Sequence, residues 1–468
     1  SALRVLTSGA ANVAIGLEAG KETTIGDYNV YIGYQAAYRT AGLNNQYNTM
    51  VGYQAGAGDW TSGASNNNTA LGAFAMGGGA LNASVNNVCV GYSAGYLLTT
   101  GDQNTAVGYQ ALVSAQTSQA NVAIGYFALE ELTFNGNSYN TAVGVESGKE
   151  LTTGIKNTFI GAYAGNVSTD VDNAVIIGYN AGAAVMTSGA DGTVAIGHSA
   201  LSGLTTGASN IAIGLKSLTV HTTGARNIAI GDHAMTDTNA GDTSLGSADN
   251  VFIGYTAGGG TWTDAASNQN IGIGTNVMNG ALAGALNNVG IGNAALNALT
   301  SGDSNTALGY LAGNDLTTGH SNVLLGSSAG KLSQTGLYNI AIGTDAFDAE
   351  DGNASYAIAI GLNALGGTNH DDADFNIAIG HNAVASANTS GMSGIVIIGQ
   401  TAGFAMNNAG TNYTTGIGFE VFRNLTSGQG NTAIGKHALY AEDNGDHSTA
   451  VGFEALKAQT GTSGTVAN

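Results

Sequence analysis

Apolar and polar positions recur along the chain in a fixed five-residue phrase, of which Asn140–Gly144 (Asn-Thr-Ala-Val-Gly) is one copy. Aligned on the closing glycine, 25 copies run from Gly16 to Gly452, and 12 of the 24 intervals between them are 17 residues long. The other intervals run from 18 to 23 residues. The residue before the glycine is always Ile, Val or Leu, and Asn stands four residues before it in 19 copies. Self-similarity at a fixed period marks a repeat architecture with one structural unit per copy.

The phrase itself is typical of a short β-strand that is buried on both faces. Its second and fourth residues are β-branched or apolar and share one face, whereas its third residue, Ala in 14 copies, lies on the other face. We expect the second and fourth residues to face the core and the third to face a close neighbour. The glycine is expected to end the strand, either through a positive φ or because another backbone approaches it closely.

The rest of each unit is also patterned. Ala follows the glycine by three residues in 21 copies, and the next position is bimodal: Gly in 10 copies, Ala37 in one and a larger apolar residue in 14. Leu-Thr-Thr-Gly, as at Leu151–Gly154, Leu204–Gly207 and Leu316–Gly319, supplies an apolar anchor and a turn. A 17-residue period is too short for a helical hairpin, and each helical Gly would cost about 1 kcal/mol.

These patterns predict an all-β fold, a parallel β-solenoid (β-roll or β-helix) of about 25 coils with a period of 17–20 residues. Stacking of the coils would place each Asn above the Asn of the preceding coil, which would form a ladder of side-chain amides. The variant phrase Asn173–Gly178 (Asn-Ala-Val-Ile-Ile-Gly) is interpreted as a one-residue insertion. Residues 1–468 are expected to form one continuous array, cut within a repeat at both ends, because Ala2–Gly9 and Thr465–Ala467 match parts of a coil.

Composition and charge exclude several classes of function. The chain has only 11 Lys and Arg and a net charge of −20, so it lacks the basic footprint of nucleic-acid binding. No apolar run approaches 18 residues, so we expect no membrane insertion. The single cysteine, Cys89, excludes an intrachain disulfide, and its place as the third residue of a phrase predicts a small apolar role.

Candidate chemistry is sparse. The eight histidines follow no ligand spacing and are interpreted as solvated or at coil edges. The best cation candidate is the cluster of His370, Asp371, Asp372 and Asp374, although a solvated loop explains it more simply. There is no Gly-x-Ser-x-Gly elbow, and no Gly-rich stretch has the Lys and helix of a phosphate loop. We therefore predict no catalytic residue, metal or cofactor, and no enzymatic activity.

One column of aromatic residues is a possible ligand-contact stripe. Tyrosines that directly follow the glycine would form a file along the solenoid and could contact sugars. The alternative is that they shield the coil corner or a seam between subunits. These residues are Tyr34, Tyr53, Tyr92, Tyr109, Tyr126, Tyr179, Tyr255 and Tyr310.

Asn104–Leu112 and Asn305–Gly319 carry a resemblance to known repeats most clearly. The array resembles the head repeats of trimeric autotransporter adhesins and the long repeat arrays of bacteriophage tail fibres and tailspikes. The resemblance covers nearly the whole chain and implies parallel β-rolls, three of which pack about one axis at a virion or bacterial cell surface. The thin core of a 17-residue coil independently favours a homotrimer, although a monomeric solenoid remains open.

We therefore expect a structural extracellular fibre protein, the rigid shaft of a trimeric phage tail fibre or surface adhesin used for attachment. Its partners would be copies of itself, and other fibre, virion or cell-surface proteins at both ends. One alternative is an adhesin that binds cell-surface glycans itself, and another is a subunit of an end-to-end extracellular filament. Ice binding through threonines is disfavoured because Thr-Thr-Gly recurs in only a minority of coils.

Overall fold

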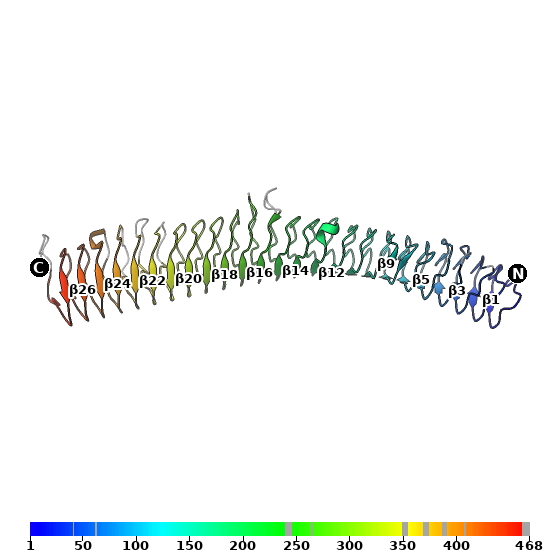
Figure 1. The fold of residues 1–468 in the computed structure, drawn as a ribbon, viewed down its shortest axis with the longest axis horizontal. Helices are drawn as coiled ribbons and strands as arrows, with labels where there is room; N and C mark the ends of the chain where they lie inside the picture. Colours follow the sequence, from blue (N-terminus) through cyan, green and yellow to red (C-terminus); the bar gives the residue numbers. More distant parts are fainter. Residues whose placement is uncertain are drawn as a thin grey trace. The chain divides into compact units, whose positions relative to one another are not determined.

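The computed structural model describes residues 1–40, 42–60, 63–238, 246–263, 265–348, 354–367, 374–385, 391–406 and 409–460. The chain divides into two compact units, Ser1–Asn227 and Ile228–Asn468. Each unit is a parallel β-solenoid to which every coil contributes one three-residue strand (Figure 1).

In the described part of the first unit, the strands of the repeat are β1 (Val13–Ile15), β2 (Val30–Ile32), β3 (Thr49–Val51), β4 (Thr69–Leu71), β5 (Val88–Val90), β6 (Thr105–Val107), β8 (Val122–Ile124), β10 (Thr141–Val143), β11 (Thr158–Ile160), β12 (Val175–Ile177), β13 (Val194–Ile196) and β14 (Ile211–Ile213). Neighbouring loops add a short parallel pair, β7 (Ser118–Gln119) with β9 (Gly136–Asn137). A 3-10 helix, η1, covers Ser188–Ala190.

In the described part of the second unit, the strands are β15 (Ile228–Ile230), β16 (Val251–Ile253), β17 (Ile271–Ile273), β18 (Val289–Ile291), β19 (Thr306–Leu308), β20 (Val323–Leu325), β21 (Ile340–Ile342), β22 (Ile358–Ile360), β23 (Ile377–Ile379), β24 (Val396–Ile398), β25 (Thr415–Ile417), β26 (Thr432–Ile434) and β27 (Thr449–Val451). A second 3-10 helix, η3, covers Ala409–Thr411.

Equivalent phrase positions stack on one another from coil to coil. Strands β10 and β11, for example, pair in parallel with Thr141 opposite Thr158 and Ala142 opposite Phe159. Counted from one strand to the next, the two units together make about 23 turns with a period of about 18 residues. The predicted all-β parallel solenoid and its period are therefore confirmed.

The two faces of each strand are the reverse of the sequence expectation. In β10 the middle residue, Ala142, is fully buried, whereas Thr141 and Val143 are only partly buried. The middle residue thus points into the coil, and the second and fourth residues of the phrase point outward. Our prediction was wrong because a period of two separates the faces of a strand without saying which one is inside.

The coil interior is filled by two positions that compensate each other in size: the middle strand residue and the residue four after the closing glycine. Beside the large Phe159, that second position is Gly165, where an added Cβ would collide with the Phe159 ring. Beside the small Ala106 it is the buried Leu112. This pairing explains the bimodal column of the sequence. Three coils combine Ala with Gly (Ala14, Ala142 and Ala307), and each precedes a coil with a large middle residue (Tyr31, Phe159 and Leu324).

The closing glycine satisfies both predicted reasons for its presence. Gly144 has a φ of 142°, and a Cβ there would collide with the carbonyl group of Gly161 in the next coil. L-amino acids are strained at such a φ, and the backbones of stacked coils leave no room for a side chain. At Gly154, in a Leu-Thr-Thr-Gly turn, φ does not require glycine, but a Cβ would collide with the Val171 carbonyl group and with the Leu151 side chain.

Other corners of the coil use the left-handed conformation without glycine. Gln103, Gln110 and Leu112 have φ values of 58°, 52° and 56°. Such residues cost about 1 kcal/mol or more in isolation. The backbone N–H of each donates to a carbonyl group of a neighbouring coil, at 2.9 to 3.0 Å, so stacking offsets this strain.

The asparagine ladder is confirmed. The Oδ1 atom of Asn104 accepts hydrogen bonds from the backbone N and the Nδ2 of Asn121, both at 3.0 Å, while its own Nδ2 donates to the Ser118 carbonyl group.

The predicted insertion at Asn173–Gly178 is wrong. Ala174 occupies the ladder position there, since its backbone N donates to Asn157 Oδ1 at 2.8 Å, and the strand register continues without an extra residue.

A second polar ladder was not predicted. Two residues before the Asn position, a side-chain oxygen often accepts a hydrogen bond from a backbone N of the preceding coil. Asp102 Oδ1 accepts from Val85 at 2.7 Å, and Asp303 Oδ1 accepts from Leu286 at 2.7 Å. The recurrence of Asp or Asn at this position was the signal in the sequence that could have revealed it.

Candidate functional site: the outward sheet face

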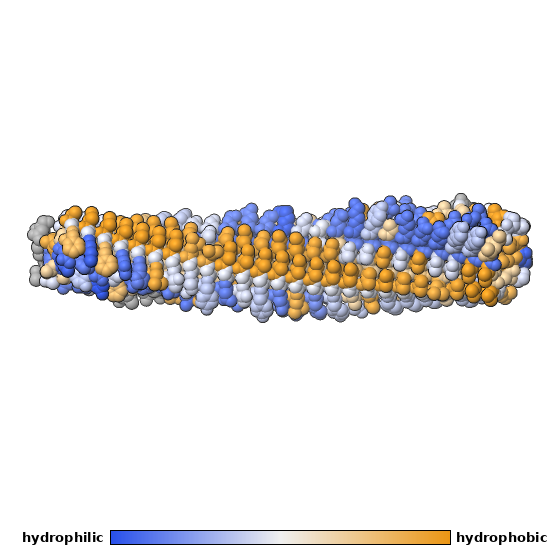
Figure 2. All heavy atoms as spheres, turned by 90° about the horizontal axis from the view of Figure 1, so that it is seen from below, coloured by the Kyte–Doolittle hydropathy of each residue, from blue (hydrophilic) through white to orange (hydrophobic). Residues whose placement is uncertain are grey.

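The outward face of the strands is an uncovered apolar surface in each unit. We call it the outward sheet face and define it by the first and third residues of each repeat strand. Every one of these residues is Val, Ile, Leu or Thr, and none is charged. Figure 2 shows the apolar ones as rows of orange side chains that run from one strand to the next, across the strand direction.

All of these side chains are at least partly exposed, and several are more than a third exposed. Ile15 is 60 %, Leu71 48 % and Ile273 38 % exposed, whereas the middle residues of their strands are buried or half-buried. An antiparallel sheet with one wet face usually places polar residues there, and parallel sheets are usually covered on both faces. A continuous apolar row on a solvent-exposed parallel sheet is therefore a candidate surface for contact.

The predicted tyrosine column borders this face. All eight tyrosines are exposed, between 40 % and 56 %. Within the described part of the chain, the structure brings several of them into stacks: Tyr34 with Tyr53, and Tyr109 with both Tyr92 and Tyr126, at ring-centroid distances of 5.2 to 5.3 Å. Tyr179 instead stacks on His198, which holds the same column position one coil later, at 5.3 Å. Among the described residues, Tyr255 and Tyr310 stack on no other tyrosine of this column.

A second aromatic column, which the sequence analysis missed, lies at the other end of the strands, directly before the Asn position. Its stacks join Tyr28 to Tyr47, and Tyr356 to both Tyr338 and Phe375, at 5.1 to 5.2 Å. The signal was present, because an aromatic residue recurs there at a fixed offset. It was overlooked because most copies carry a polar residue at this position.

The stacked geometry limits what the aromatic columns can do. The rings of Tyr92 and Tyr109 are nearly parallel, 9° apart, so each covers a face of the other. Sugars pack against open ring faces, whereas these stacks present ring edges and hydroxyl groups. Tyrosine ring edges with their hydroxyl groups suit the rim of a protein–protein contact, where the ring is buried and the hydroxyl group stays in water.

Titratable side chains in the coil interior have a structural rather than a chemical environment. The thiol of Cys89 is buried, and burial raises its pKa to about 12, which confirms its role as a small apolar residue. His221 corrects the expectation of solvated histidines: it is fully buried at the position that Leu204 holds one coil earlier. Burial lowers its pKa to about 4, against a smaller opposite effect of a hydrogen bond to the Gly224 backbone.

The acidic cluster is only partly described: His370, Asp371 and Asp372 lie outside the described residues. The carboxylate of Asp374 accepts a hydrogen bond from the backbone N of Ser355 at 2.7 Å and so belongs to the second polar ladder. Among described side chains, no group of three or more His, Cys, Asp or Glu is placed to hold a metal ion.

The described residues contain no helix that is long and apolar enough to cross a membrane. Neither a protein-family model nor a curated protein matches the sequence. What the structure establishes is thus the parallel β-solenoid itself, with an uncovered apolar sheet face bordered by aromatic columns.

Proposed function

We propose that this chain is a structural extracellular fibre protein whose copies associate side by side through the outward sheet face. The assembly would be the rigid, repetitive shaft of a trimeric phage tail fibre or a surface adhesin used for attachment, with a mechanical rather than an enzymatic role. The observation that carries the proposal is that the outward rows of both units are uncharged and consist of Ile, Val and Leu with some Thr.

Physical reasoning supports this role for the face. Exposed rows of Ile, Val and Leu cost free energy in water, about 25 cal/mol per Å² of apolar surface. A soluble monomer would be expected to carry charges at such positions, as edge and surface strands do. Charged residues are instead confined to other columns, as with Glu18 and Lys21, which form an ion pair beyond the strand. Three copies that met about an axis would bury all three faces at once.

Sedimentation equilibrium of the purified chain tests the proposal. We expect a mass close to three times 46.4 kDa. The double variant Ile124→Lys with Ile160→Lys places two charges on the outward sheet face, where both side chains are partly exposed and no core contact is lost. This variant should sediment as a folded monomer, because burying unpaired charges in an interface is strongly unfavourable.

The matched control adds the same two charges elsewhere. Thr100→Lys with Thr153→Lys changes exposed residues of two Thr-Thr-Gly turns, away from the strands. This control should keep the wild-type mass, and circular dichroism should show the β-rich fold in all three proteins. A monomeric wild type at micromolar concentration, or an oligomer that tolerates both lysines on the sheet face, would refute the proposed contact.

A further inference from the structure

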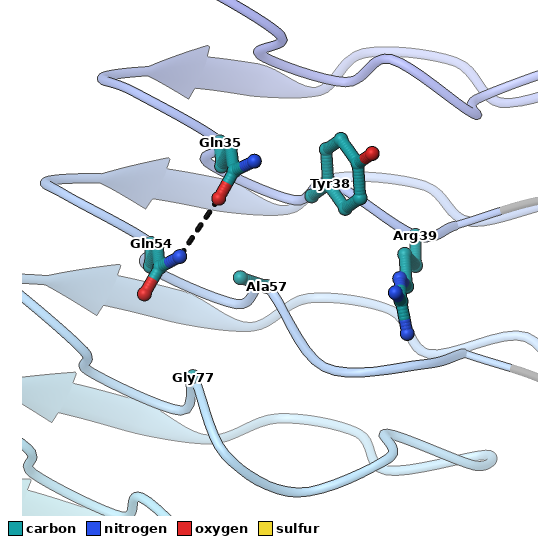
Figure 3. Close-up of a pocket in the computed structure, with 6 residues that line it drawn as sticks. All are labelled: Gln35, Tyr38, Arg39, Gln54, Ala57 and Gly77. Atoms are coloured by element: carbon teal, nitrogen blue, oxygen red, sulfur yellow. Dashed lines mark hydrogen bonds between the residues drawn. The ribbon is translucent and has the colours of Figure 1, made fainter.

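A polar notch of about 290 Å³ lies in the first unit, in the loops that follow β2, β3 and β4 (Figure 3). It lies off the outward sheet face, so association through that face does not require it. Figure 3 shows Gln35 and Gln54 on one side, Tyr38 and Arg39 on the other, and Ala57 between them. The residues that line the notch are Gln35, Tyr38, Arg39, Gln54, Ala57 and Gly77.

The notch arises from a gap in one column of side chains. Five residues after the closing glycine, the successive coils carry Lys21, Tyr38, Ala57, Gly77 and Tyr96. The two small residues leave a hollow two coils wide between larger neighbours. A stacked solenoid repeats its surface from coil to coil, so a local break in one column creates a recess that the repeat alone would not form.

One side of the notch ends in an open hydrogen-bond acceptor. Gln54 Nε2 donates to Gln35 Oε1 at 2.7 Å, and Gln35 Nε2 donates to Glu18 Oε2 at 2.8 Å. The next residue in this column is Phe74, which cannot continue the chain of amides. Among the hydrogen bonds of the described residues, Gln54 Oε1 has none, although its amide is held in place.

The charged groups at the notch form ion pairs. Arg39 Nη1 lies 2.8 Å from Asp59 Oδ1. Lys21 Nζ donates to the Tyr38 hydroxyl at 2.9 Å and to Glu18 at 2.8 Å, which holds the Tyr38 side chain. The notch is thus polar and has no unpaired cation, with remaining N–H donors on Arg39 and an acceptor on Gln54.

We propose that this notch binds a neutral saccharide unit. Its hydroxyl groups would bond to Gln54 Oε1 and to the Arg39 guanidinium, and its C–H groups would pack against Ala57 and Tyr38. Paired charges disfavour an anionic ligand, and the polar lining disfavours an apolar one. The volume lies at the lower end of the range for ligand sites, about 300 Å³, which suits one or two sugar rings. This inference goes beyond the proposed fibre role and does not depend on it.

Saturation-transfer difference NMR on the full chain tests the inference. The probes are glucose, galactose, mannose, N-acetylglucosamine, maltose and lactose, each at about 10 mM, because a single shallow subsite is expected to bind with a Kd on the order of 1 mM. Glucuronic acid and N-acetylneuraminic acid are the anionic comparison. We expect saturation transfer to at least one neutral sugar.

Two variants locate the binding. Ala57→Tyr fills the notch with the side chain that the same column carries at Tyr38 and Tyr96, so the fold should tolerate it and the signal should disappear. Gln54→Leu removes the amide with a residue that the same column carries at Leu311, and it should weaken binding at least threefold. Val113→Tyr makes the equivalent substitution outside the notch and should leave binding unchanged.

Three results would overturn the inference. The first is the absence of saturation transfer to every neutral sugar, and the second is an undiminished signal in Ala57→Tyr. The third is saturation transfer that is seen only with the anionic sugars and is lost in Ala57→Tyr. The notch would then bind a different class of ligand. None of these results bears on sedimentation of the wild type, so failure here is distinguishable from failure of the proposed fibre role.

Discussion

At the scale of single residues, the closing glycine is held by two constraints that act together. Gly144→Val should destabilise the first unit by at least about 3 kcal/mol, because valine is strained at positive φ and its Cβ meets a backbone carbonyl group that cannot move without its coil. In the structure Gly144 has a φ of 142°, and a Cβ added there would meet the carbonyl group of Gly161. Urea denaturation of wild type and variant measures the difference.

The control for this substitution is Gly246→Val. Among the described residues, a Cβ at Gly246 would meet no atom within 4 Å, and the φ of Gly246 lies outside the left-handed region. We expect its effect on stability to stay within about 0.5 kcal/mol, as for most surface substitutions. Equal denaturation midpoints for wild type and Gly144→Val would contradict the packing described for the corner.

His221 makes the stability of the first unit depend on pH. Its pKa is about 4 in the folded chain, below its usual value of 6.5, because the buried ring is kept neutral. Nε2 lies 3.1 Å from Asn227 Nδ2, whose N–H donates to the neutral ring. Below about pH 6.5 the imidazole of His221 binds a proton in the unfolded chain but stays neutral in the folded chain. The free energy of unfolding is therefore unaffected above pH 6.5 and falls between pH 6.5 and 4.

The expected loss across this window is about 3 kcal/mol, from roughly 1.4 kcal/mol for each pH unit. His221→Leu places in this coil the residue that Leu204 provides one coil earlier, and it should remove this part of the pH dependence. Urea denaturation of both proteins at pH 7 and pH 5 gives the comparison. The same pH dependence in wild type and His221→Leu would show that the histidine is not responsible.

At the scale of the coil, the paired core positions predict strong coupling between two substitutions. Ala106→Phe should overpack the interior against Leu112, and Leu112→Gly should leave a cavity, each at a cost of about 2 to 4 kcal/mol. Phe159 lies between Gly165 of its own coil and Gly148 of the preceding coil. The double variant would reproduce these surroundings, because the coil before Ala106 already has Gly95 at the position of Gly148.

We therefore expect the double variant to be at least about 2 kcal/mol more stable than the sum of the single effects predicts. A double-mutant cycle by urea denaturation measures this coupling. Additive losses would mean that the size compensation seen along the chain is incidental. The cycle also separates packing from backbone effects, because glycine at position 112 relieves the strain of a left-handed residue in both backgrounds.

At the scale of the whole molecule, the uneven placement of charge and apolar surface is the main functional clue. The chain carries a net charge of −20, yet its outward strand positions carry none. Acidic residues that keep a chain soluble also repel neighbouring copies, so any association must use a surface from which charge is excluded. The sedimentation experiment with lysines on the outward sheet face belongs to this scale, since it asks whether that surface is where copies meet.

Much of the fold could be predicted because stacking constrains each coil to resemble its neighbours. The period, the strand at each phrase, the asparagine ladder and the glycine corner follow from the residues of a single repeat, as around Asn104 and Gly144. The alternation of residues along the strand could not tell which face is buried, because Ala142 and Val143 are both acceptable in a core. The second aromatic column and the polar notch depend on a few coils that depart from the consensus, as at Tyr28 and Ala57, and consensus reasoning discards such departures.

By itself the sequence determined the period, the stacking of like residues on like, and the exclusion of charge from the strands, because these follow from local chemistry repeated many times. Only the tertiary structure decided which face of the strands is uncovered. That choice depends on how the opposite wall fills the coil: residues such as Leu112 occupy the interior above Ala106 and leave no room for the β-branched residues, which therefore point outward. Two positions that are six residues apart in the chain pack together and share the volume of the coil interior. The residues of a strand alone therefore do not determine which of its faces is buried.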